Sequence, residues 1–484
     1  MVGHAFCQDR TPVPGAPLSA YPATGLPAGA TFPLSLIEDV LAEAGAVQRR
    51  RRLLPAAAVM VFVLGCCLFC GDSYGEVARK LAGWLGPLAG PGGWRVPGTS
   101  ALARARRRLG AAPFELLFAR LAGPLAGPAV PGAHAFGRLL AALDGTVLAV
   151  PWTPANTTAW GPPPSGRRGA GGFPQVRLVT LAGCGTRGLA AAALGPRKGK
   201  GTSEQDLARQ IARGGRIRRG MLVLADRNFC GWSVISALTA SGADVLIRGK
   251  SGQSLPVLEV LPDGSYLSVL ADPAASRRRH ARNAARRRRG SALPPGTVTT
   301  EGIPVRVIEA VITTRTPGSP PRTGRYRLIT TLLNPAEAPA AQVAACYAQR
   351  WEAETGYKEI KVFLRGPGRV LRSRDPGGVK QEIWALLCAA QLIHAARTRA
   401  AARAGLDPDR ISFTITLHAI RRAATATRRQ PATAEILSRL LPARRARSYP
   451  RNIHASTTAR RKTRPARAGP VTHTITIQPP PPSP

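Results

Sequence analysis

The spacing of apolar residues divides the chain into a helical part and a strand-rich part. Between residues 36 and 126 apolar positions recur every three or four residues, which predicts a small all-α unit. Within it, Asp72 or Ser73 is suited to cap one helix, and Thr99 or Ser100 another. The preceding residues 1–35 are rich in Pro, Gly and Ala and are predicted to form a flexible leader, and the Gly/Pro-rich run 123–132 a linker.

From residue 139 the period changes from that of a helix to that of a strand. Three strand-like runs are followed by a helix, a strand, a second helix and a last strand. The runs are 139–150, 175–184, 188–194, a helix to about 214 opened by the capping-box spacing Thr202-Ser203-Glu204-Gln205, the buried strand 221–225, helix 232–240 and strand 243–248. This order is typical of an α/β, ribonuclease-H-like core.

The second half of the chain interrupts that core and then completes it. Residues 249–335 contain short β-rich runs around a basic tract, 277–289, which we expect to be a disordered loop able to contact phosphate. A long apolar helix at about 379–404 is expected to pack on the sheet, with one more helical stretch beyond Leu406. From about residue 443 the Arg-rich and Pro-rich tail is predicted to have no fixed structure.

The charge of the chain indicates a polyanionic partner. Lys and Arg number 68 against 26 Asp and Glu, a net charge of +42, which favours nucleic acid ahead of a membrane surface. A G+C-rich genome would explain part of the Arg excess but not the shortage of acids. One helix of the N-terminal unit carries Arg104, Arg106, Arg107 and Arg108. We interpret it as a DNA-docking helix, with Arg104 and Arg107 as contact residues, rather than as a solvated face.

The cysteines and the longest apolar run favour a cytoplasmic protein without a membrane anchor. The eight cysteines lack the spacing of a disulfide framework. Cys66, Cys67 and Cys70 resemble half of a zinc site, but no second pair follows, so buried thiols are the better interpretation. Residues 53–71 are almost long enough to cross a bilayer, yet Ala, Gly and Cys dilute their hydrophobicity. A buried core helix, no signal peptide and a cytoplasmic location are therefore expected.

One polar stripe stands out in residues 347–361. At about 100° per residue, a helix would place Tyr347, Arg350, Glu354 and Lys361 on one narrow face. Glu352 and Glu359 would project to the opposite side. The periodicity alone leaves two explanations open: a functional site, or a solvated face with charge pairs between successive turns.

The spacing of that stripe matches a known signature. Tyr, two residues, Arg, three residues, Glu, six residues and Lys resembles the signature of the bacterial DDE transposases in the group named after insertion sequence four. The match becomes specific because two aspartates precede it, Asp144 within the first strand and Asp226 at the end of the fourth. An unpaired carboxylate in an apolar strand is costly, so a structural role for Asp144 is hard to argue; Asp226 could simply begin a turn. The resemblance implies that the two aspartates are neighbours at the sheet centre and that 249–335 is a β-rich insertion domain.

The chemistry follows from this set of acids. Cleaving and rejoining phosphodiesters requires an activated oxygen nucleophile and neutralisation of growing negative charge, which two Mg²⁺ ions about 4 Å apart can provide. Asp144, Asp226 and Glu354 are the predicted ligands, with Mn²⁺ as a substitute. By resemblance Asp144 would bridge both ions, and Tyr347, Arg350 and Lys361 would hold the flanks of the cleaved phosphate.

Other residues near this signature are candidates for DNA contact or for packing. Arg227 is a further candidate for phosphate contact. Trp351 and Tyr357 are expected to pack rather than to stack on bases. Some relatives hold a flipped base with an aromatic of the insertion, but in this chain that region has no Trp or Phe, only Tyr266 and Tyr326, so the hairpin route stays open.

The leading hypothesis is a cut-and-paste transposase that binds double-stranded transposon ends and target DNA as a homodimer in a synaptic complex. The alternatives are a ribonuclease-H-like nuclease without strand transfer and an inactive end-binding regulator. The intact acids argue against the regulator, and the helical N-terminal unit and the insertion favour the transposase over the nuclease. The predicted units are 1–35 (leader), 36–130 (helical), 131–248 (core), 249–335 (insertion), 336–405 (core completion) and 406–484 (C-terminal helix and tail).

Overall fold

The computed structural model describes most of the chain between residues 34 and 480. The described residues are 34–47, 54–89, 95–123, 125–127, 129–162, 165–166, 169–170, 172–250, 252–253, 255–289, 301–315, 320–426, 432–443 and 472–480. The predicted leader, apart from its last two residues, and residues 444–471 of the predicted tail lie outside these ranges.

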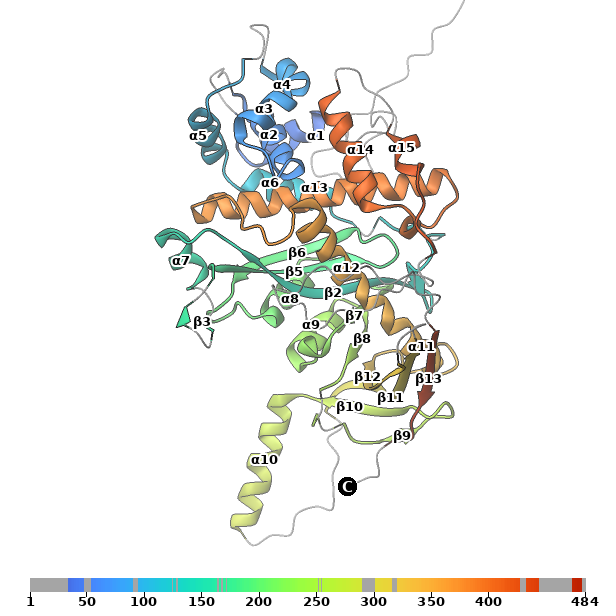
Figure 1. Ribbon diagram of the computed structural model, residues 1–484. Coiled ribbons are helices and arrows are strands. Elements are labelled where there is room, and N and C mark those ends of the chain that lie inside the picture. The colour runs from blue at the N-terminus through green and yellow to red at the C-terminus, as the bar shows by residue number, and fades with distance from the viewer. Residues whose placement is uncertain are drawn as a thin grey trace, which may run out of the picture.

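The predicted N-terminal helices are present and gather on one side of the molecule (Figure 1). They are α1 (Leu34–Glu43), α2 (Ala56–Leu68), α3 (Tyr74–Lys80), α4 (Ala82–Ala89), α5 (Thr99–Leu109) and α6 (Ala112–Leu121). Ser73 caps α3 by accepting a hydrogen bond from the Glu76 N–H, as one of the two predicted candidates. The predicted cap of α5 was wrong, because that helix already begins at Thr99 and Gly98 is its N-cap.

Helix α2 accounts for the long apolar run. Most of its side chains are buried, which confirms the prediction of a core helix. Within the described ranges no helix combines the length and the apolar character needed to cross a bilayer. The seven cysteines of the described residues are free; Cys67 is buried, whereas Cys66 and Cys70 are partly buried.

In the described part of the chain, a mixed sheet of eleven strands forms the centre of the molecule. Its strands are β1 (His134–Ala135), β2 (Arg138–Ala149), β5 (Gln175–Gly183), β6 (Leu189–Pro196), β7 (Met221–Ala225), β8 (Asp244–Arg248), β9 (Glu259–Val260), β10 (Tyr266–Ala271), β11 (Gly302–Arg315), β12 (Arg322–Thr330) and β13 (Thr472–Ile477). The spatial order is β6-β5-β2-β7-β8-β12-β11-β10-β9. β2 pairs antiparallel with β5 and parallel with β7, so the first predicted strand lies in the middle of the core.

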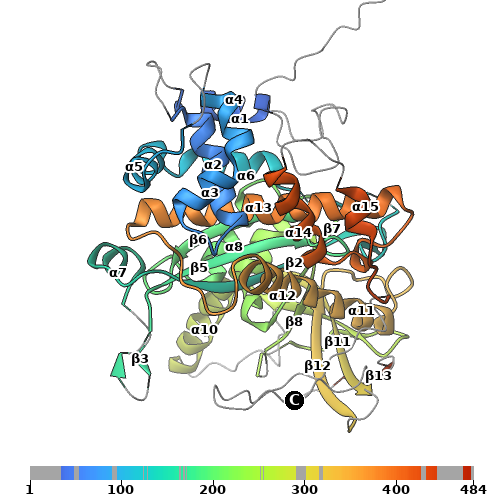
Figure 2. The same ribbon diagram turned by 45° about the horizontal axis from the view of Figure 1, so that its top comes forward.

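Helices cover both faces of this sheet (Figure 2). Leu143, Val223 and Ala225 pack on one face with α8 (Glu204–Arg213) and α9 (Trp232–Ala240). Leu140 and Leu224 point to the other face, toward α11 (Ala340–Cys346). This alternation follows from the two-residue period of a strand. The capping box of α8 is formed by Ser203 and Asp206, one residue later than predicted.

The remaining elements complete the two layers and the ends of the sheet. They are α7 (Pro154–Trp160), the β3–β4 pair (Ser165–Gly166 and Gly169–Ala170), η3 (Arg227–Phe229), α10 (Pro273–Arg288), η4 (Tyr347–Arg350), α12 (Trp351–Lys358), η5 (Glu359–Leu364), α13 (Pro376–Arg403), η6 (Pro408–Arg410), α14 (Phe413–Thr425) and α15 (Thr433–Leu437). Helix α13 separates the N-terminal helices from the sheet, as Figure 1 shows. It corresponds to the predicted long apolar helix.

The insertion extends the core sheet. β12 pairs antiparallel with β8, so the hydrogen-bonded ladder continues from the core into β11 and β10. The prediction of an unstructured tail was wrong for residues 472–477, because β13 pairs with β11. Its Thr/Ile alternation suits a strand, since β-branched residues favour extended backbone.

The basic tract of the insertion is helical, contrary to the predicted disordered loop. Helix α10 runs through it to Arg288 and extends away from the sheet (Figure 1). Asp272 caps the helix by accepting a hydrogen bond from the Ala274 N–H, and Pro273 occupies its first position. Ala and Arg are among the best helix formers, and this local preference explains the helix.

Candidate active site

The two predicted aspartates meet because β2 and β7 run parallel in register. Leu143 is opposite Ala225, and the next residues along the two strands are Asp144 and Asp226. The Asp144 carboxylate accepts a hydrogen bond from the Gly145 N–H at 2.8 Å. Asp226 accepts one from the Asn228 N–H at 2.8 Å and thereby caps the 3₁₀ turn η3. Asp226 therefore does begin a turn, at the same sheet edge as Asp144.

The segment that carries Glu354 is not one continuous α-helix. The 3₁₀ turn η4 precedes α12, and the π-helical turn η5 follows it, so a uniform 100° per residue was the wrong geometry for this stretch. Arg350 nevertheless lies close to two of the predicted acids. One Arg350 guanidinium nitrogen lies 3.7 Å from Asp144 and another 3.0 Å from Glu354. Arg350 thus connects the first acid to the third.

The other two signature residues contact the same strands. The Tyr347 hydroxyl donates a hydrogen bond to the carbonyl of Ala225 at 3.3 Å. The Lys361 ammonium donates to the Thr146 hydroxyl at 3.1 Å. Both contacts lie within two residues of an aspartate, so η4, α12 and η5 together cover the middle of β2 and the end of β7.

The side of α12 away from Glu354 is fixed by buried charges. The Arg187 guanidinium lies 3.0 Å from Glu352 and 2.8 Å from Glu359 and also contacts Asp409. Arg397 lies 3.0 Å from Glu359. Glu352 and Glu359 therefore project away from the site, as predicted, and anchor its helix to the core.

The two aromatic residues of α12 have different environments. Tyr357 is buried; its hydroxyl donates to the Asp144 carbonyl at 2.5 Å and accepts from the Thr180 N–H at 3.2 Å. This confirms its predicted packing role. Trp351 is 46% exposed, with the Arg350 guanidinium 5.2 Å from its ring centroid, so its packing role stays a prediction.

The tyrosines of the insertion are not freely presented. Tyr266 is buried. The ring of Tyr326 is partly buried, with the Arg248 guanidinium 4.4 Å from its centroid and the Tyr347 ring at 6.4 Å. Trp351, beside the acids, is therefore more exposed than either of these tyrosines.

The environment shifts the pKa values of several groups in the site. Burial raises the pKa of Asp144 to about 6; the Gly145 N–H and Arg350 act against this rise, and the negative charges of Asp226 and Glu354 add to it. Burial raises the pKa of Tyr347 to about 12. The pKa of Lys361 is lowered by burial and by Arg365. A cation bound nearby would therefore stabilise the charged form of Asp144.

Sequence reasoning missed Glu204, a fourth carboxylate beside the site. A Cβ built on Gly145 would come within 2.7 Å of the Glu204 carboxyl group, and Glu204 accepts a hydrogen bond from the Asn228 side chain. Glu204 therefore borders the residue after Asp144 and is linked through Asn228 to Asp226. Its position in the first turn of α8 is an ordinary place for an acid, so the sequence carried no signal for this proximity.

The predicted phosphate contacts divide into two groups. Arg227 is exposed directly after Asp226. Arg104 and Arg107 are exposed on α5, in the N-terminal helical unit, and Arg106 of the same helix is buried.

The acids have the donor chemistry of a divalent-cation site. Asp144, Asp226 and Glu354 offer oxygen ligands, which suit Mg²⁺ and Mn²⁺. In the part of the chain that the structure describes, no three His, Cys, Asp or Glu side chains are already arranged around a common metal position. Instead the Arg350 guanidinium supplies positive charge between Asp144 and Glu354. The residues fit a cation chemically, and binding through both carboxylates requires them to exchange this guanidinium contact.

A ribonuclease-H-like strand order with acids at its central edge defines an enzyme of metal-dependent phosphoryl transfer on nucleic acid. The family model "Transposase DDE domain" matches residues 135–392, and "Insertion element 4 transposase N-terminal" matches residues 29–119. Since the first match covers more than half of the chain, the protein belongs to the DDE transposase family, in agreement with the predicted resemblance.

Two individual proteins are similar to this chain. The chain is 27% identical over 382 residues to the transposase InsG for insertion sequence element IS4 of Escherichia coli (strain K12), covering 78% of each protein. A solved piggyBac transposase synaptic complex with hairpin DNA matches 81% of this chain and 77% of its own, at 8% identity and a TM-score of 0.41.

The family fixes the general activity. The protein is a transposase that cleaves DNA and transfers strands, and DDE domains depend on a divalent metal. The predictions of a ribonuclease-H-like fold with a helical N-terminal region and of transposase function are confirmed.

Proposed function

We propose that Asp144, Asp226 and Glu354 are the catalytic acids of cut-and-paste transposition in this protein. The observation that carries the proposal is their convergence: parallel register sets Asp144 beside Asp226, and Arg350 joins Asp144 to Glu354. Burial raises the pKa of Asp144 to about 6, so a metal cation bound there would stabilise its charged form.

The three acids would hold two Mg²⁺ ions, with Mn²⁺ as a substitute. When bound, the ions supply Lewis-acid stabilisation of the pentavalent phosphate and lower the pKa of the attacking oxygen. The chain itself contributes position and charge. Gly145 donates its N–H to Asp144, and Tyr357 holds the backbone at the same residue, so β2 presents this carboxylate in a fixed place.

The cationic neighbours are proposed to hold the DNA strand. Arg350, once released from Asp144, and Lys361, beside Thr146, are within reach of phosphates flanking the scissile bond. Arg227 is exposed at the same edge. Tyr347 ties η4 to the carbonyl before Asp226 and would contact phosphate only by giving up that hydrogen bond.

The rest of the proposal concerns the assembly. Arg104 and Arg107 of α5 would contact the DNA of the transposon ends, and two copies of the chain would pair two ends in a synaptic complex. We keep the division into a helical unit (36–130), a core (131–248 and 336–405), an insertion (249–335) and a C-terminal part (406–484). The DNA substrate supports a location at the bacterial nucleoid.

The decisive experiment substitutes each acid in turn. Asp144→Ala, Asp226→Ala and Glu354→Ala proteins are incubated with duplex DNA carrying the ends of the element and Mg²⁺. We expect nicking and strand transfer to fall by at least about 1,000-fold, because each substitution removes a ligand of the reacting centre. End binding, measured by fluorescence anisotropy, should remain.

Glu38→Gln is the matched control, since Glu38 is exposed on α1, far along the chain from the three acids. Normal nicking by any one of the three variants would remove that acid from the proposed set. Nicking without strand transfer by the unmodified protein would instead favour a nuclease.

A further inference from the structure

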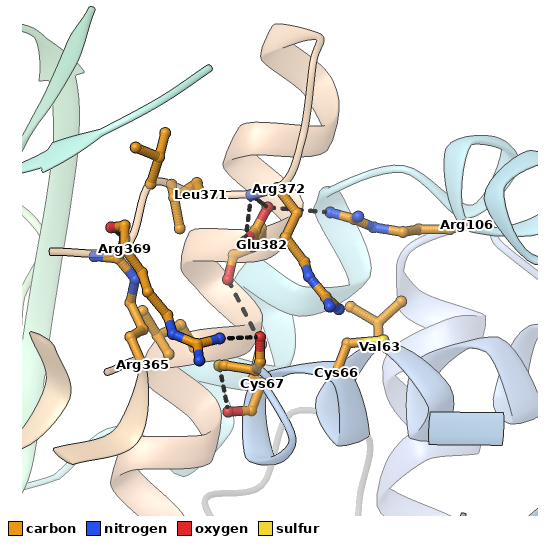
Figure 3. A pocket seen from close by; sticks show the side chains of 12 residues that line it. Val63, Cys66, Cys67, Arg106, Arg365, Arg369, Leu371, Arg372 and Glu382 are labelled. Carbon is orange, nitrogen blue, oxygen red and sulfur yellow. Dashed lines mark hydrogen bonds and ion pairs between the residues drawn. The ribbon is translucent and has the colours of Figure 1, made fainter. Parts of the chain in front are cut away.

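A second concentration of charge lies away from the acids, in a pocket between the N-terminal helices and the segment that joins η5 to α13 (Figure 3). The pocket and the open solvent at its mouth together contain about 460 Å³ of space not filled by protein atoms. Its charged lining residues are Arg106, Arg365, Arg369, Arg372 and Glu382. Figure 3 shows Arg365 and Arg369 on one side, Arg106 on the other and Arg372 between them.

The one carboxylate of the lining is already engaged. Glu382 accepts hydrogen bonds from the backbone N–H groups of Arg372, at 2.9 and 3.0 Å, and Ser373, at 3.0 Å. It also lies 3.7 Å from the Arg106 guanidinium. Arg106 is held further by Gln381 at 2.6 Å and by the Gly378 carbonyl at 3.0 Å. Glu382 and Arg106 therefore form a structural pair that connects α5 to α13.

The other three arginines have neutral partners. Arg369 donates to the Cys70 carbonyl at 2.8 Å, Arg365 to the Arg369 carbonyl, and Arg372 to the Asp72 carbonyl. Carbonyl oxygens satisfy N–H groups but do not neutralise charge. One terminal nitrogen of Arg372, Nη1, is buried and has no hydrogen-bond partner among the residues that the structure describes. Such a nitrogen is expensive unless a ligand completes it.

The surrounding groups do not supply the missing negative charge. Burial raises the pKa of Cys66 to about 12, and that of Cys70 is also raised by burial, so both thiols stay neutral. Burial lowers the pKa of Arg365, and the nearby Arg369 charge lowers it further, whereas Glu382 acts in the opposite direction. The lining of the pocket therefore carries net positive charge, and a bound anion would neutralise part of it.

We propose that this pocket binds a phosphate group, and that in the working transposase it is a backbone phosphate of the bound DNA. Planar guanidinium groups that converge from several sides suit the geometry of a phosphate. The assignment to DNA rests on the proposed function, because a transposase must hold its duplex on both sides of the reacting bond.

The segment that lines the pocket is attached to the strand that carries Asp144. The Leu371 N–H donates to the Ala149 carbonyl at 2.9 Å, so the lining segment is attached to the end of β2. Asp144 lies about five residues earlier on that strand, which corresponds to about 17 Å at roughly 3.3 Å per residue. Since one DNA strand carries a phosphate about every 3.4 Å of helix axis, the phosphate would lie about five nucleotides from the scissile bond.

The test uses full-length Arg372→Gln and Arg369→Gln proteins. Arg374→Gln is the matched control, because Arg374 is exposed in the same segment but does not line the pocket. Binding of duplex end DNA is measured by anisotropy over a range of salt concentrations, and binding of inorganic phosphate by calorimetry at constant ionic strength. Arg369 is exposed, so its substitution tests the pocket even if Arg372→Gln weakens folding.

We expect each pocket variant to bind DNA about tenfold more weakly than the control, since a charge-assisted contact is lost. The slope of log affinity against log salt should shrink by about 0.9. End DNA can also be made with a single neutral methylphosphonate about five nucleotides from the scissile bond. This change should weaken DNA binding by the unmodified protein and the control by a similar factor, and should affect DNA binding by Arg372→Gln little.

Equal DNA affinities and salt slopes for the pocket variants and the control would overturn the proposal. Weakened binding of inorganic phosphate alone, with unchanged DNA binding, would overturn the assignment to DNA and identify a small-anion site. DNA binding without nicking by the unmodified protein would count against the proposed function but leave this pocket supported by its own variants.

Discussion

At the scale of single residues, Arg350 has the most consequential position. Its guanidinium contacts both Asp144 and Glu354, and it is largely buried. A cation bound by these acids would take over the neutralisation that Arg350 now provides. The arginine and the metal are thus alternative partners of the same carboxylates.

Removing Arg350 should therefore matter most without metal. We expect Arg350→Ala to lower the free energy of unfolding by about 2 kcal/mol in EDTA, the usual worth of hydrogen bonds to charged groups. Saturating Mg²⁺ should reduce that loss, because the cation replaces the guanidinium charge. Urea denaturation with and without Mg²⁺ measures both values. If Arg350→Ala lost the same free energy of unfolding with and without Mg²⁺, the metal would not replace Arg350 as the partner of these carboxylates.

Gly145 offers a second residue-scale prediction, which concerns Glu204. Gly145→Ala would place a methyl group within 2.7 Å of the Glu204 carboxyl, so this side chain must move and its contact with Asn228 is disturbed. We expect nicking to fall by about tenfold with little change in stability, a barrier increase of about 1.4 kcal/mol.

The companion substitution Glu204→Ala removes the side chain that the new methyl group would meet. In this background, Gly145→Ala should cause little further loss of nicking, so the double variant should be about as active as Glu204→Ala alone. Gly75→Ala is the control, because a Cβ at Gly75 in α3 meets no atom within 4 Å. If the losses of nicking activity in the two single variants simply added up in the double variant, Glu204 would not be the cause of the Gly145→Ala defect.

At the scale of elements, the segment carrying Glu354 is held from both sides. Its inner side contacts β2 and β7 through Tyr347 and Lys361. Its outer side is anchored by the buried Arg187, which contacts Glu352 and Glu359. Three helix types succeed one another within this segment, so these contacts rather than a regular helix define where Glu354 points.

The buried anchor leads to a stability prediction. Arg187→Met would leave Glu352, Glu359 and Asp409 without their shared guanidinium, and breaking a buried ion cluster in this way costs about 3–5 kcal/mol. Arg209→Met is the control, since Arg209 pairs with Asp206 at the surface within one helix turn. It should cost less than about 1 kcal/mol. Similar midpoints of urea denaturation for the two variants would contradict the role of the cluster.

His394 on α13 should make stability depend on pH. Burial lowers its pKa from 6.5 to about 3, even though Glu359 acts in the opposite direction. Between about pH 6.5 and 3 the unfolded chain binds a proton that the folded chain does not, so stability is complete above this window and falls as pH falls through it. The slope is at most about 1.4 kcal/mol per pH unit.

His394→Leu should flatten this part of the stability profile, measured by urea denaturation at several pH values. His134→Gln is the control, because His134 is exposed at the sheet edge. An unchanged slope in His394→Leu would assign the acid sensitivity to other groups.

The sequence was most informative where periodicity and spacing report on local structure. Core strands such as β2, with Asp144 inside it, and β7, with Asp226 after its end, could be predicted, because strand periodicity and a carboxylate in an apolar run are visible in the residues themselves. The helix α10 was missed because charge density was given more weight than the helix preference of Ala and Arg. Glu204 and the pairing of β13 depend on contacts between distant segments, which no local pattern encodes.

At the scale of the whole molecule, the N-terminal helices and the catalytic core share hydrophobic interior. One cluster of buried side chains runs from α1 through α13, and Phe118 of α6 packs on Trp384 of α13 with ring centroids 5.3 Å apart. Gln381 adds hydrogen bonds to the Arg106 and Gly110 carbonyls at 2.9 and 2.5 Å. The unit expected to grip DNA is therefore attached rigidly to the helix that covers the sheet.

This shared interior predicts that the two units unfold together. Phe118→Ala should cost about 3–5 kcal/mol, because it leaves a cavity against Trp384, and it should lower the melting temperature of the catalytic core as well as that of the helices. Scanning calorimetry should give one transition for both the unmodified and the variant protein, whereas Val96→Ala, at an exposed position, should change little. Two separate transitions, with only the first shifted by Phe118→Ala, would mean that the helical unit is an independent domain. A single shifted transition would instead mean that DNA bound by the N-terminal helices is held at a fixed distance from Asp144, as cleavage at one defined bond requires.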